Sequence, residues 1–178
     1  MATMTRLLRW AGLLALLTGL TACGILGRGK DDGSRFGRAS GKEVACLERA
    51  MFFESNRSSR DGLVAVGSVV MNRVASDQYP DTICGVVGQK NQFASGVLSK
   101  PMTASGLPEV QEAARAVMRG ERHPMIGNAM FFHVASARFG YDNMHYTVTA
   151  GGNAFYEKRK GNVTQPVPLP AMEGLTGR

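Results

Sequence analysis

The stretch from Lys42 to Glu54, KEVACLERAMFFE, carries apolar side chains at helical spacing and contains neither glycine nor proline. Val44, Leu47 and Met51 recur at the three- and four-residue intervals that place side chains on one face of an α-helix. We therefore predict an amphipathic helix over this stretch. Its charged final residue, Glu54, falls near the carboxyl end.

The following segment predicts a second and more apolar helix. After the polar residues 55–60, the carboxylate of Asp61 is suited to cap the first turn, because it can accept hydrogen bonds from unpaired backbone N–H groups. Valine, leucine and methionine then recur as far as Val74 and form a wide apolar face, despite Gly67. This width predicts a central, buried helix.

The rest of the chain predicts one more helix and a small sheet. Pro108 begins an apolar-periodic run that stops at Gly120, and the stretch before it is loop-rich, with a turn signal at 78–81. Segments rich in aromatic and β-branched residues predict short strands at 129–134, 145–149 and 153–156. We expect an α+β fold with a helical core and a small β element.

The amino-terminal segment, residues 1–23, has the order of residues that is typical of a secretory signal. Arg6 and Arg9 precede an apolar run that is too short to span a bilayer, and small residues follow it. The sequence LTAC at 20–23 resembles a bacterial lipobox, in which Cys23 is acylated and becomes the new amino terminus. The alternative is an ordinary signal that leaves Cys23 unmodified, and either interpretation predicts export.

The predicted boundaries follow from changes in composition. Residues 24–41 are rich in glycine and charge and predict a flexible linker. We place one globular domain at 42–160 and an extended, proline-rich, surface-lying tail at 161–178. A glycine at position 24, directly after the lipobox cysteine, favours delivery to an outer membrane, facing the periplasm, if the organism has two membranes.

The chain is basic, with a formal net charge of +7. Removal of residues 1–23 takes away Arg6 and Arg9 and no acid, which lowers the net charge to +5. A basic exported protein can be drawn to anionic lipid, to nucleic acid or to an acidic polymer such as peptidoglycan. Because the basic residues are dispersed rather than gathered around an aromatic recognition motif, we do not expect a nucleic-acid partner.

Cysteine and histidine spacing bears on disulfides and metals. If Cys23 is consumed by lipid, Cys46 and Cys84 remain, and an oxidising compartment favours a disulfide between them over the alternative of two buried free thiols. The chain has three histidines, but their spacing contains no compact zinc motif, so we expect no metal and no cofactor. A zinc amidase is therefore a weak alternative.

Glu54 is the candidate for acid–base chemistry. It follows Met51, Phe52 and Phe53, whose apolar side chains disfavour the charged form of a carboxyl group and raise its pKa. A carboxyl that stays protonated near neutral pH can act as a general acid, which glycoside cleavage requires because the leaving oxygen must be protonated. The alternative is a solvated glutamate at a helix end.

Several stretches together resemble the bacterial cell-wall hydrolase family that includes the spore-cortex-lytic enzymes. That resemblance implies a lysozyme-like fold, an acid/base role for the glutamate that matches Glu54, and lytic transglycosylation of peptidoglycan. The matching stretches are Ala45-Cys46-Leu47, Phe53-Glu54, 62–66, Asn72-Arg73-Val74, Tyr79-Pro80, 83–87 and Gln92-Phe93, followed more loosely by 129–133 and 151–156.

The chain departs from the family pattern just after Glu54. Where the family often has a second glutamate this chain has Ser58, and Asn56 also differs, so a mechanism with a carboxylate at position 58 is not available. One carboxyl suffices if the muramyl 6-hydroxyl closes onto the anomeric carbon and gives a 1,6-anhydro end at the MurNAc–GlcNAc β-1,4 linkage. Asp61 and Glu48 are possible partner acids.

Further residues are candidates for binding the glycan, although structural roles are the alternative for each of them. Polar side chains can bind the N-acetyl and hydroxyl groups, and an aromatic ring can stack on a sugar face. The rival to an enzyme is a noncatalytic lipoprotein that binds peptidoglycan and reaches the membrane through its lipid anchor. The candidates are Asn72, Gln92, His133, Tyr146 and Tyr156 for hydrogen bonds and Phe93 for stacking.

Overall fold

The computed structural model describes residues 41–55, 59–102 and 105–177, which all belong to the compact unit Asp31–Arg178. The predicted signal segment, the lipobox and nearly all of the predicted linker lie outside the described residues. The two departures from the family pattern, Asn56 and Ser58, lie outside them as well.

Four helices form the larger part of this unit. They are α1 (Gly41–Glu54), α2 (Arg60–Ala75), α3 (Ile83–Val87) and α4 (Leu107–Met118). The three long helices confirm the expected segments. The short helix α3 was not expected, because its five residues are too few to show a period; its amino end is capped by the side chain of Thr82, which accepts a hydrogen bond from the backbone N–H of Gly85.

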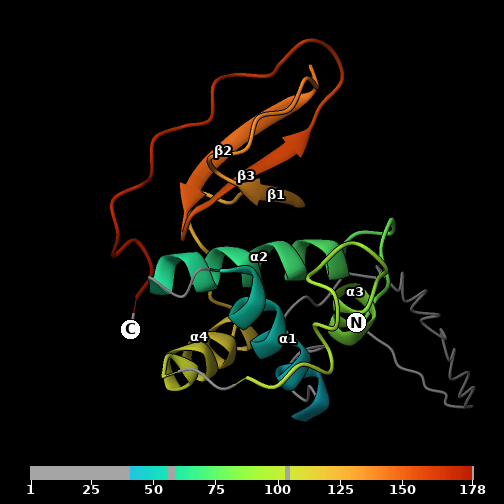
Figure 1. The fold of residues 1–178 in the computed structure, drawn as a ribbon, viewed down its shortest axis with the longest axis vertical. Helices are drawn as coiled ribbons and strands as arrows, with labels where there is room; N and C mark the ends of the chain where they lie inside the picture. The colour runs from blue at the N-terminus through green and yellow to red at the C-terminus, as the bar shows by residue number, and fades with distance from the viewer. Residues whose placement is uncertain (1–40, 56–58, 103–104, 178) are drawn as a thin grey trace, which may run out of the picture. The chain divides into compact units, whose positions relative to one another are not determined.

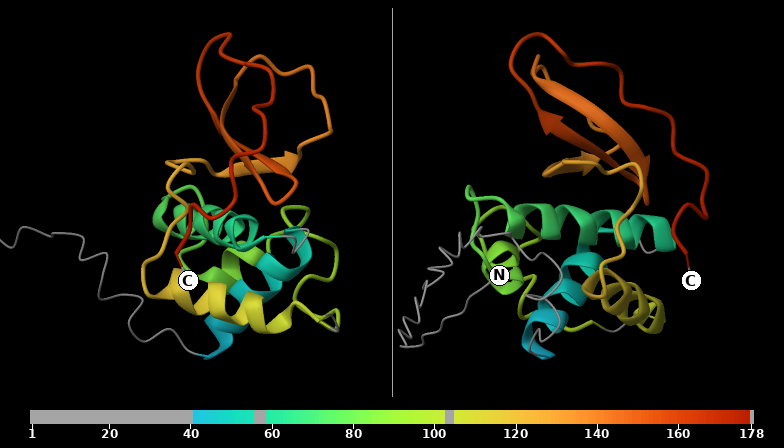
Figure 2. Two further views of the ribbon diagram at one scale, coloured as in Figure 1. Left: turned by 90° about the vertical axis from the view of Figure 1, so that its left-hand side faces the viewer. Right: turned by 180° about the vertical axis from the view of Figure 1, so that it is seen from behind.

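Helix α2 lies between the other helices and the sheet (Figures 1 and 2). On one side Leu63 and Val70 pack into a core shared with α1, α3 and α4. On the other side Val66 and Val69 pack against Phe155 and other apolar residues of the sheet. Burial of apolar surface on both sides explains the wide apolar face, and the prediction of a central helix is confirmed.

The sheet has three antiparallel strands in the order β1-β3-β2, which confirms the expected small β element. The strands are β1 (Phe131–Val134), β2 (Met144–Ala150) and β3 (Asn153–Lys158). Side chains alternate between the two faces of a sheet. Phe132 and Phe155 therefore face α2, whereas their neighbours along the strands point to the opposite face.

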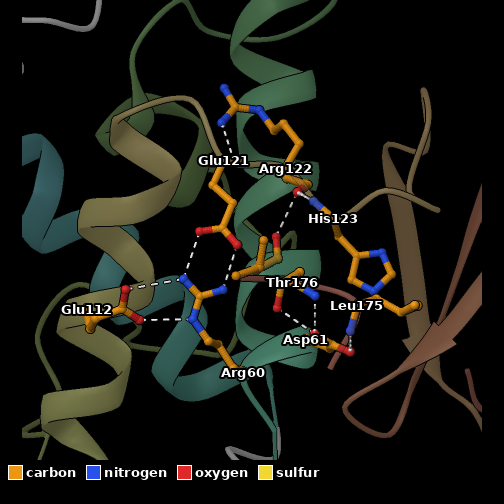
Figure 3. Close-up of polar contacts among 10 residues, drawn as sticks. Arg60, Asp61, Glu112, Glu121, Arg122, His123, Leu175 and Thr176 are labelled. Atoms are coloured by element: carbon orange, nitrogen blue, oxygen red, sulfur yellow. Dashed lines mark hydrogen bonds and ion pairs between the residues drawn. The ribbon is translucent and has the colours of Figure 1, made fainter. Parts of the chain in front are cut away.

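The amino end of α2 is capped by Ser59 and not by Asp61, so that expectation was wrong. The side chain of Ser59 accepts a hydrogen bond from the N–H of Gly62. Asp61 lies two residues after the cap position, within the first turn of the helix, and is buried. Its carboxylate accepts hydrogen bonds from the N–H groups of Leu175 and Thr176 and from the Thr176 hydroxyl (Figure 3).

The tail after residue 160 is largely extended, as expected, but its end is anchored. The N–H of Ala171 donates to the Thr149 carbonyl, and Pro170 forms a parallel bridge with Thr149 on β2. Thr176 is then buried against Asp61. The tail thus connects the edge of the sheet to the start of α2, and the expectation of a surface-lying segment fails at its end.

The disulfide Cys46–Cys84 joins α1 to α3 and confirms the expected pairing. Both helices contribute buried side chains to the core shared with α2 and α4. None of the helices in the described part of the chain is long and apolar enough to cross a membrane.

Candidate active site

Glu54 is the last residue of α1, and its carboxyl group points to the loop that follows α3. The Oε1 atom accepts a hydrogen bond from the backbone N–H of Ala94 at 2.5 Å. The side chain is half-buried, and the Ala94 that binds it directly follows the buried Phe93. A carboxyl in this position is partly shielded from water and is held in one orientation by a backbone group.

Three influences act on the Glu54 carboxyl. Burial raises its pKa and is the largest of them, whereas the hydrogen bond from Ala94 and the positive charge of Arg73 oppose the rise. The net direction is upward, because loss of hydration costs the charged form more than these two partners return. The group therefore keeps its proton to a higher pH than a solvated glutamate.

The backbone at the end of α1 is held by the turn between β2 and β3. The side chain of Asn153 donates from Nδ2 to the Glu54 carbonyl at 2.7 Å, and Asn153 is itself buried. The same turn approaches α2 closely, since a Cβ atom added at Gly62 would lie 2.5 Å from the Cα of Gly151. Two glycines without side chains thus let the turn come close enough for Asn153 to reach Glu54.

Arg73 is a buried cation on α2 and is only 3% exposed. Its guanidinium group lies over the rings of Tyr79 and Phe93, with distances of 5.3 and 5.2 Å to the ring centroids, and its Nε donates to the carbonyl of Met130. Burial lowers its pKa, but the charge of Glu54 and the tyrosines nearby oppose this. Its Nη1 has no hydrogen-bond partner among the described residues.

The structure brings three predicted binding residues together on the sheet face that points away from α2. His133 Nε2 and the hydroxyl of Tyr146 lie 2.8 Å apart in a hydrogen bond, and the ring centroid of Tyr156 lies 5.8 Å from that of His133. Burial raises the pKa of Tyr156, and the charge of Arg73 opposes this rise. Tyr156 is therefore influenced by the same cation, Arg73, that acts on Glu54.

Three other predicted binding residues occupy different environments. Both donors of the Asn72 amide are taken, because Nδ2 donates to the carbonyls of Gly127 and Ala129. Phe93 is buried beneath Arg73 and packs toward Phe132, so it is not an open ring for a sugar. Gln92 is exposed beside Phe93, two residues before Ala94.

Neither of the possible partner acids accompanies Glu54. Asp61 is engaged by the tail. Glu48 lies nearly two turns earlier on α1, where burial raises the pKa of its carboxyl and the charge of Arg115 on α4 opposes the rise. Neither group is therefore offered as a second catalytic carboxyl.

The histidines are separated in the fold. His123 is buried and its backbone N–H donates to the hydroxyl of Ser68, His133 pairs with Tyr146, and His145 contacts Gln165. Over the ranges 41–55, 59–102 and 105–177, no group of three or more His, Cys, Asp or Glu side chains is placed to hold a metal ion.

Two of the hollows on the described part of the chain differ in their relation to Glu54. One is lined by the loop 87–99, which includes Phe93 and the Ala94 that binds Glu54. The other lies at the far end of the β2–β3 hairpin, between Asp142 and the basic residues 158–160. The first is the one related to Glu54, because its lining includes Ala94, whose N–H binds the carboxyl.

Sequence reasoning missed three groups at this site. Arg73 occupies a position that continues the apolar period of α2, four residues after Val69, and a charge in such a position is a signal of a buried cation. The Ala94 N–H and the Asn153 amide carry no comparable signal, because they act on Glu54 from residues 40 and 99 positions away.

Two solved structures share this architecture. The catalytic domain of the germination-specific lytic transglycosylase SleB from Bacillus anthracis is 23% identical, with a TM-score of 0.58, over 68% of this chain and 98% of that one. The catalytic domain of the Bacillus cereus SleB protein is 22% identical, with the same TM-score, over 68% of this chain and 94% of that one. The fold is thus of the lysozyme-like α+β class, as expected.

The profile of the cell wall hydrolase family matches residues 57–156, which is more than half of the chain. The chain belongs to the cell wall hydrolase family and is a cell-wall-degrading enzyme. The matched region contains Arg73, Ala94 and most of the sheet, and it begins three residues after Glu54. No curated protein matches the chain.

Proposed function

We propose that the chain cleaves peptidoglycan glycan strands at the MurNAc–GlcNAc β-1,4 linkage by lytic transglycosylation, with Glu54 as general acid and then general base. The observation that carries this proposal is the Glu54 carboxyl itself, half-buried at a helix end, oriented by the Ala94 N–H and raised in pKa by burial. Family membership and the lytic transglycosylase of similar fold support it.

The proposed reaction needs one carboxyl. Neutral Glu54 gives its proton to the bridging oxygen as the bond to the anomeric carbon breaks and positive charge develops there. The Ala94 N–H and the nearby charge of Arg73 then favour the carboxylate that is left. That carboxylate takes the proton of the muramyl 6-hydroxyl, whose oxygen bonds to the anomeric carbon, and no water is consumed.

The test compares two glutamates of the same helix on isolated sacculi. Glu54→Gln keeps size and polarity but cannot donate or accept the proton, so the release of soluble muropeptides is expected to fall by at least about a hundredfold. Glu48→Gln removes a half-buried carboxyl from the same helix and is expected to leave the release unchanged.

Mass spectrometry of the released material separates the possible reactions. Anhydro-muramyl ends support the proposal, whereas reducing ends indicate hydrolysis and free peptides indicate an amidase. Full activity of Glu54→Gln would exclude the carboxyl mechanism. If the wild type releases nothing but still sediments with sacculi, the chain is a binding lipoprotein rather than a lytic enzyme.

We also propose that the chain works in the cell envelope, anchored by lipid at Cys23, on the basis of the basic, apolar and small residues of its first 23 positions. Incorporation of labelled fatty acid should depend on that cysteine. Cys23→Ala is expected to abolish the label and to move the protein from the membrane fraction to the soluble exported fraction. An unlabelled wild type would contradict the anchor.

A further inference from the structure

The connection between β1 and β2 carries two aromatic rings in the open. Phe139 is 48% exposed and Tyr141 is 66% exposed, and Val134 at the end of β1 is 60% exposed. The rings of Phe139 and Tyr141 are nearly parallel, with an interplanar angle of 17° and centroids 6.1 Å apart. Gathered apolar side chains that stay in water mark a binding surface more often than scattered ones do.

These two rings are continuous with the residues around Glu54. The ring of Phe139 meets His133 edge-on, at 4.8 Å between centroids, and His133 is hydrogen-bonded to Tyr146. The rings of His133 and Tyr146 each meet Tyr156, with centroids 5.8 and 5.7 Å apart, and the charge of Arg73 acts to lower the pKa of Tyr156. An aromatic path therefore runs from the buried cation beside Glu54 to the exposed rings.

We propose that Phe139 and Tyr141 form a sugar-stacking surface that holds the glycan strand beyond the point of cleavage. This inference rests on the proposed function, because it extends the same site along the same polymer. The C–H face of a pyranose ring packs well on an aromatic ring, and a tyrosine adds a hydroxyl that can bind a sugar oxygen. A polymer of repeating sugars offers further rings to such a surface while one of its linkages lies at Glu54.

The size and chemistry of the surface favour a glycan over other occupants. The surface that two rings and one valine can bury is far smaller than the roughly 1,000 Å² that a stable protein interface buries. They are also too few to hold a membrane surface, which needs a long apolar face. Arg138, directly before Phe139 in sequence, holds the loop, since it donates to the carbonyls of Ala135 and Ala137.

The test measures binding in the full chain carrying Glu54→Gln, so that the polymer is not consumed. Phe139→Ser and Tyr141→Ser are introduced together, and binding to purified sacculi and to soluble N-acetylglucosamine oligomers is measured. Loss of two stacking contacts is expected to weaken binding about tenfold. The matched control replaces Leu169 and Met172, which are 89% and 84% exposed, by serine and should bind unchanged.

Three outcomes would overturn the inference. The first is unchanged binding of sacculi by the ring variant, and the second is equal weakening of binding in the control variant. The third is a ring variant that binds sacculi normally but loses binding to anionic lipid vesicles. The inference and the proposed function fail separately. If the rings are needed for sacculus binding but the unmutated chain releases no muropeptides, the stacking surface stands and the lytic activity does not.

Discussion

At the scale of single residues, the Glu54 carboxyl is held between opposite influences. Burial favours its neutral form, which can give a proton, while the Ala94 N–H and Arg73 favour the carboxylate, which can take one. A group that acts as an acid in one step and as a base in the next works best when neither its protonated nor its charged form is strongly favoured. Arg73 can supply its charge without water around it, because aromatic rings and a backbone carbonyl surround it.

The raised pKa of Glu54 predicts how stability depends on pH. Folded protein holds this proton more tightly than the unfolded chain, whose glutamate pKa is about 4.3, so this group's contribution falls as pH rises from there through the folded pKa. Glu54→Gln has no proton to lose, so the variant does not lose this stability as pH rises. We expect the variant to be more stable than wild type at neutral pH and equal to it at about pH 3, measured by urea unfolding. A wild type that is more stable than the variant at neutral pH, with a difference that closes toward acid, would show that the fold favours the charged carboxyl.

At the scale of elements, the end of α1, the start of α2 and the β2–β3 turn form one contact. Asn153 reaches the Glu54 carbonyl only because Gly62 and Gly151 approach each other without side chains. The close contact therefore places the carboxyl relative to the sheet, where His133, Tyr146 and Tyr156 lie. Geometry of this kind is decided by backbone packing rather than by the residues that do chemistry.

Substitution of Gly62 tests this contact. The added methyl group in Gly62→Ala would meet backbone that cannot rotate away, so we expect a loss of about 2 kcal/mol in the free energy of unfolding and reduced lytic activity. Gly41→Ala, at the start of α1, meets nothing within 4 Å and is expected to be neutral or slightly stabilising. Equal effects of the two changes in urea unfolding would contradict the argument.

The disulfide between α1 and α3 makes a separate prediction at this scale. It closes a loop with a sequence separation of 38, and restriction of the unfolded chain by such a loop contributes about 4 kcal/mol. Cys46→Ser with Cys84→Ser should lower the free energy of unfolding by an amount of that order. A reducing agent should bring the wild type to the same value and leave the variant unchanged; an unaffected wild type would mean that the bond adds little.

At the scale of the whole described unit, the carboxyl-terminal tail connects the sheet to the helices. It bonds to Thr149 on β2 and ends on Asp61 at the start of α2, beside Arg60 and its two carboxylate partners, Glu112 and Glu121 (Figure 3). Although burial raises the pKa of Asp61, its hydrogen bonds to the tail outweigh this and the pKa is lowered. The tail thus ties the edge of the sheet to the start of α2.

Asp61→Ala should release the end of the carboxyl-terminal tail from α2. Loss of charge-assisted hydrogen bonds to Leu175 and Thr176 is expected to cost about 2 kcal/mol at neutral pH and to open the tail to proteases. Because the folded pKa is depressed, the difference from wild type should shrink as pH falls below about 3.9. Asp77→Ala removes an exposed acid and serves as control; equal protease sensitivity of the two variants would contradict the role of Asp61.

Much of the fold could be predicted because it depends on local patterns. The 3.6-residue period indicated the three long helices, and enrichment in β-branched and aromatic residues indicated the three strands. Helix α3 was not predicted, because its five residues are too few to show a helical period. Within the candidate site, the roles of Glu54, His133, Tyr146 and Tyr156 stay predictions, and the clustering of the last three is a result of the fold. Phe93 and Asn72 were given binding roles although they are packed and bonded inside the fold.

The sequence by itself therefore determined which segments are helices and strands and that an acidic residue ends the first helix, because neighbouring residues decide those features. Only the tertiary structure decided what surrounds that acid. Ala94, Arg73 and Asn153 act on Glu54 from distant parts of the chain, and Asp61 binds a residue 115 positions away instead of capping its own helix. Partners so far apart are chosen by packing, which no local pattern records.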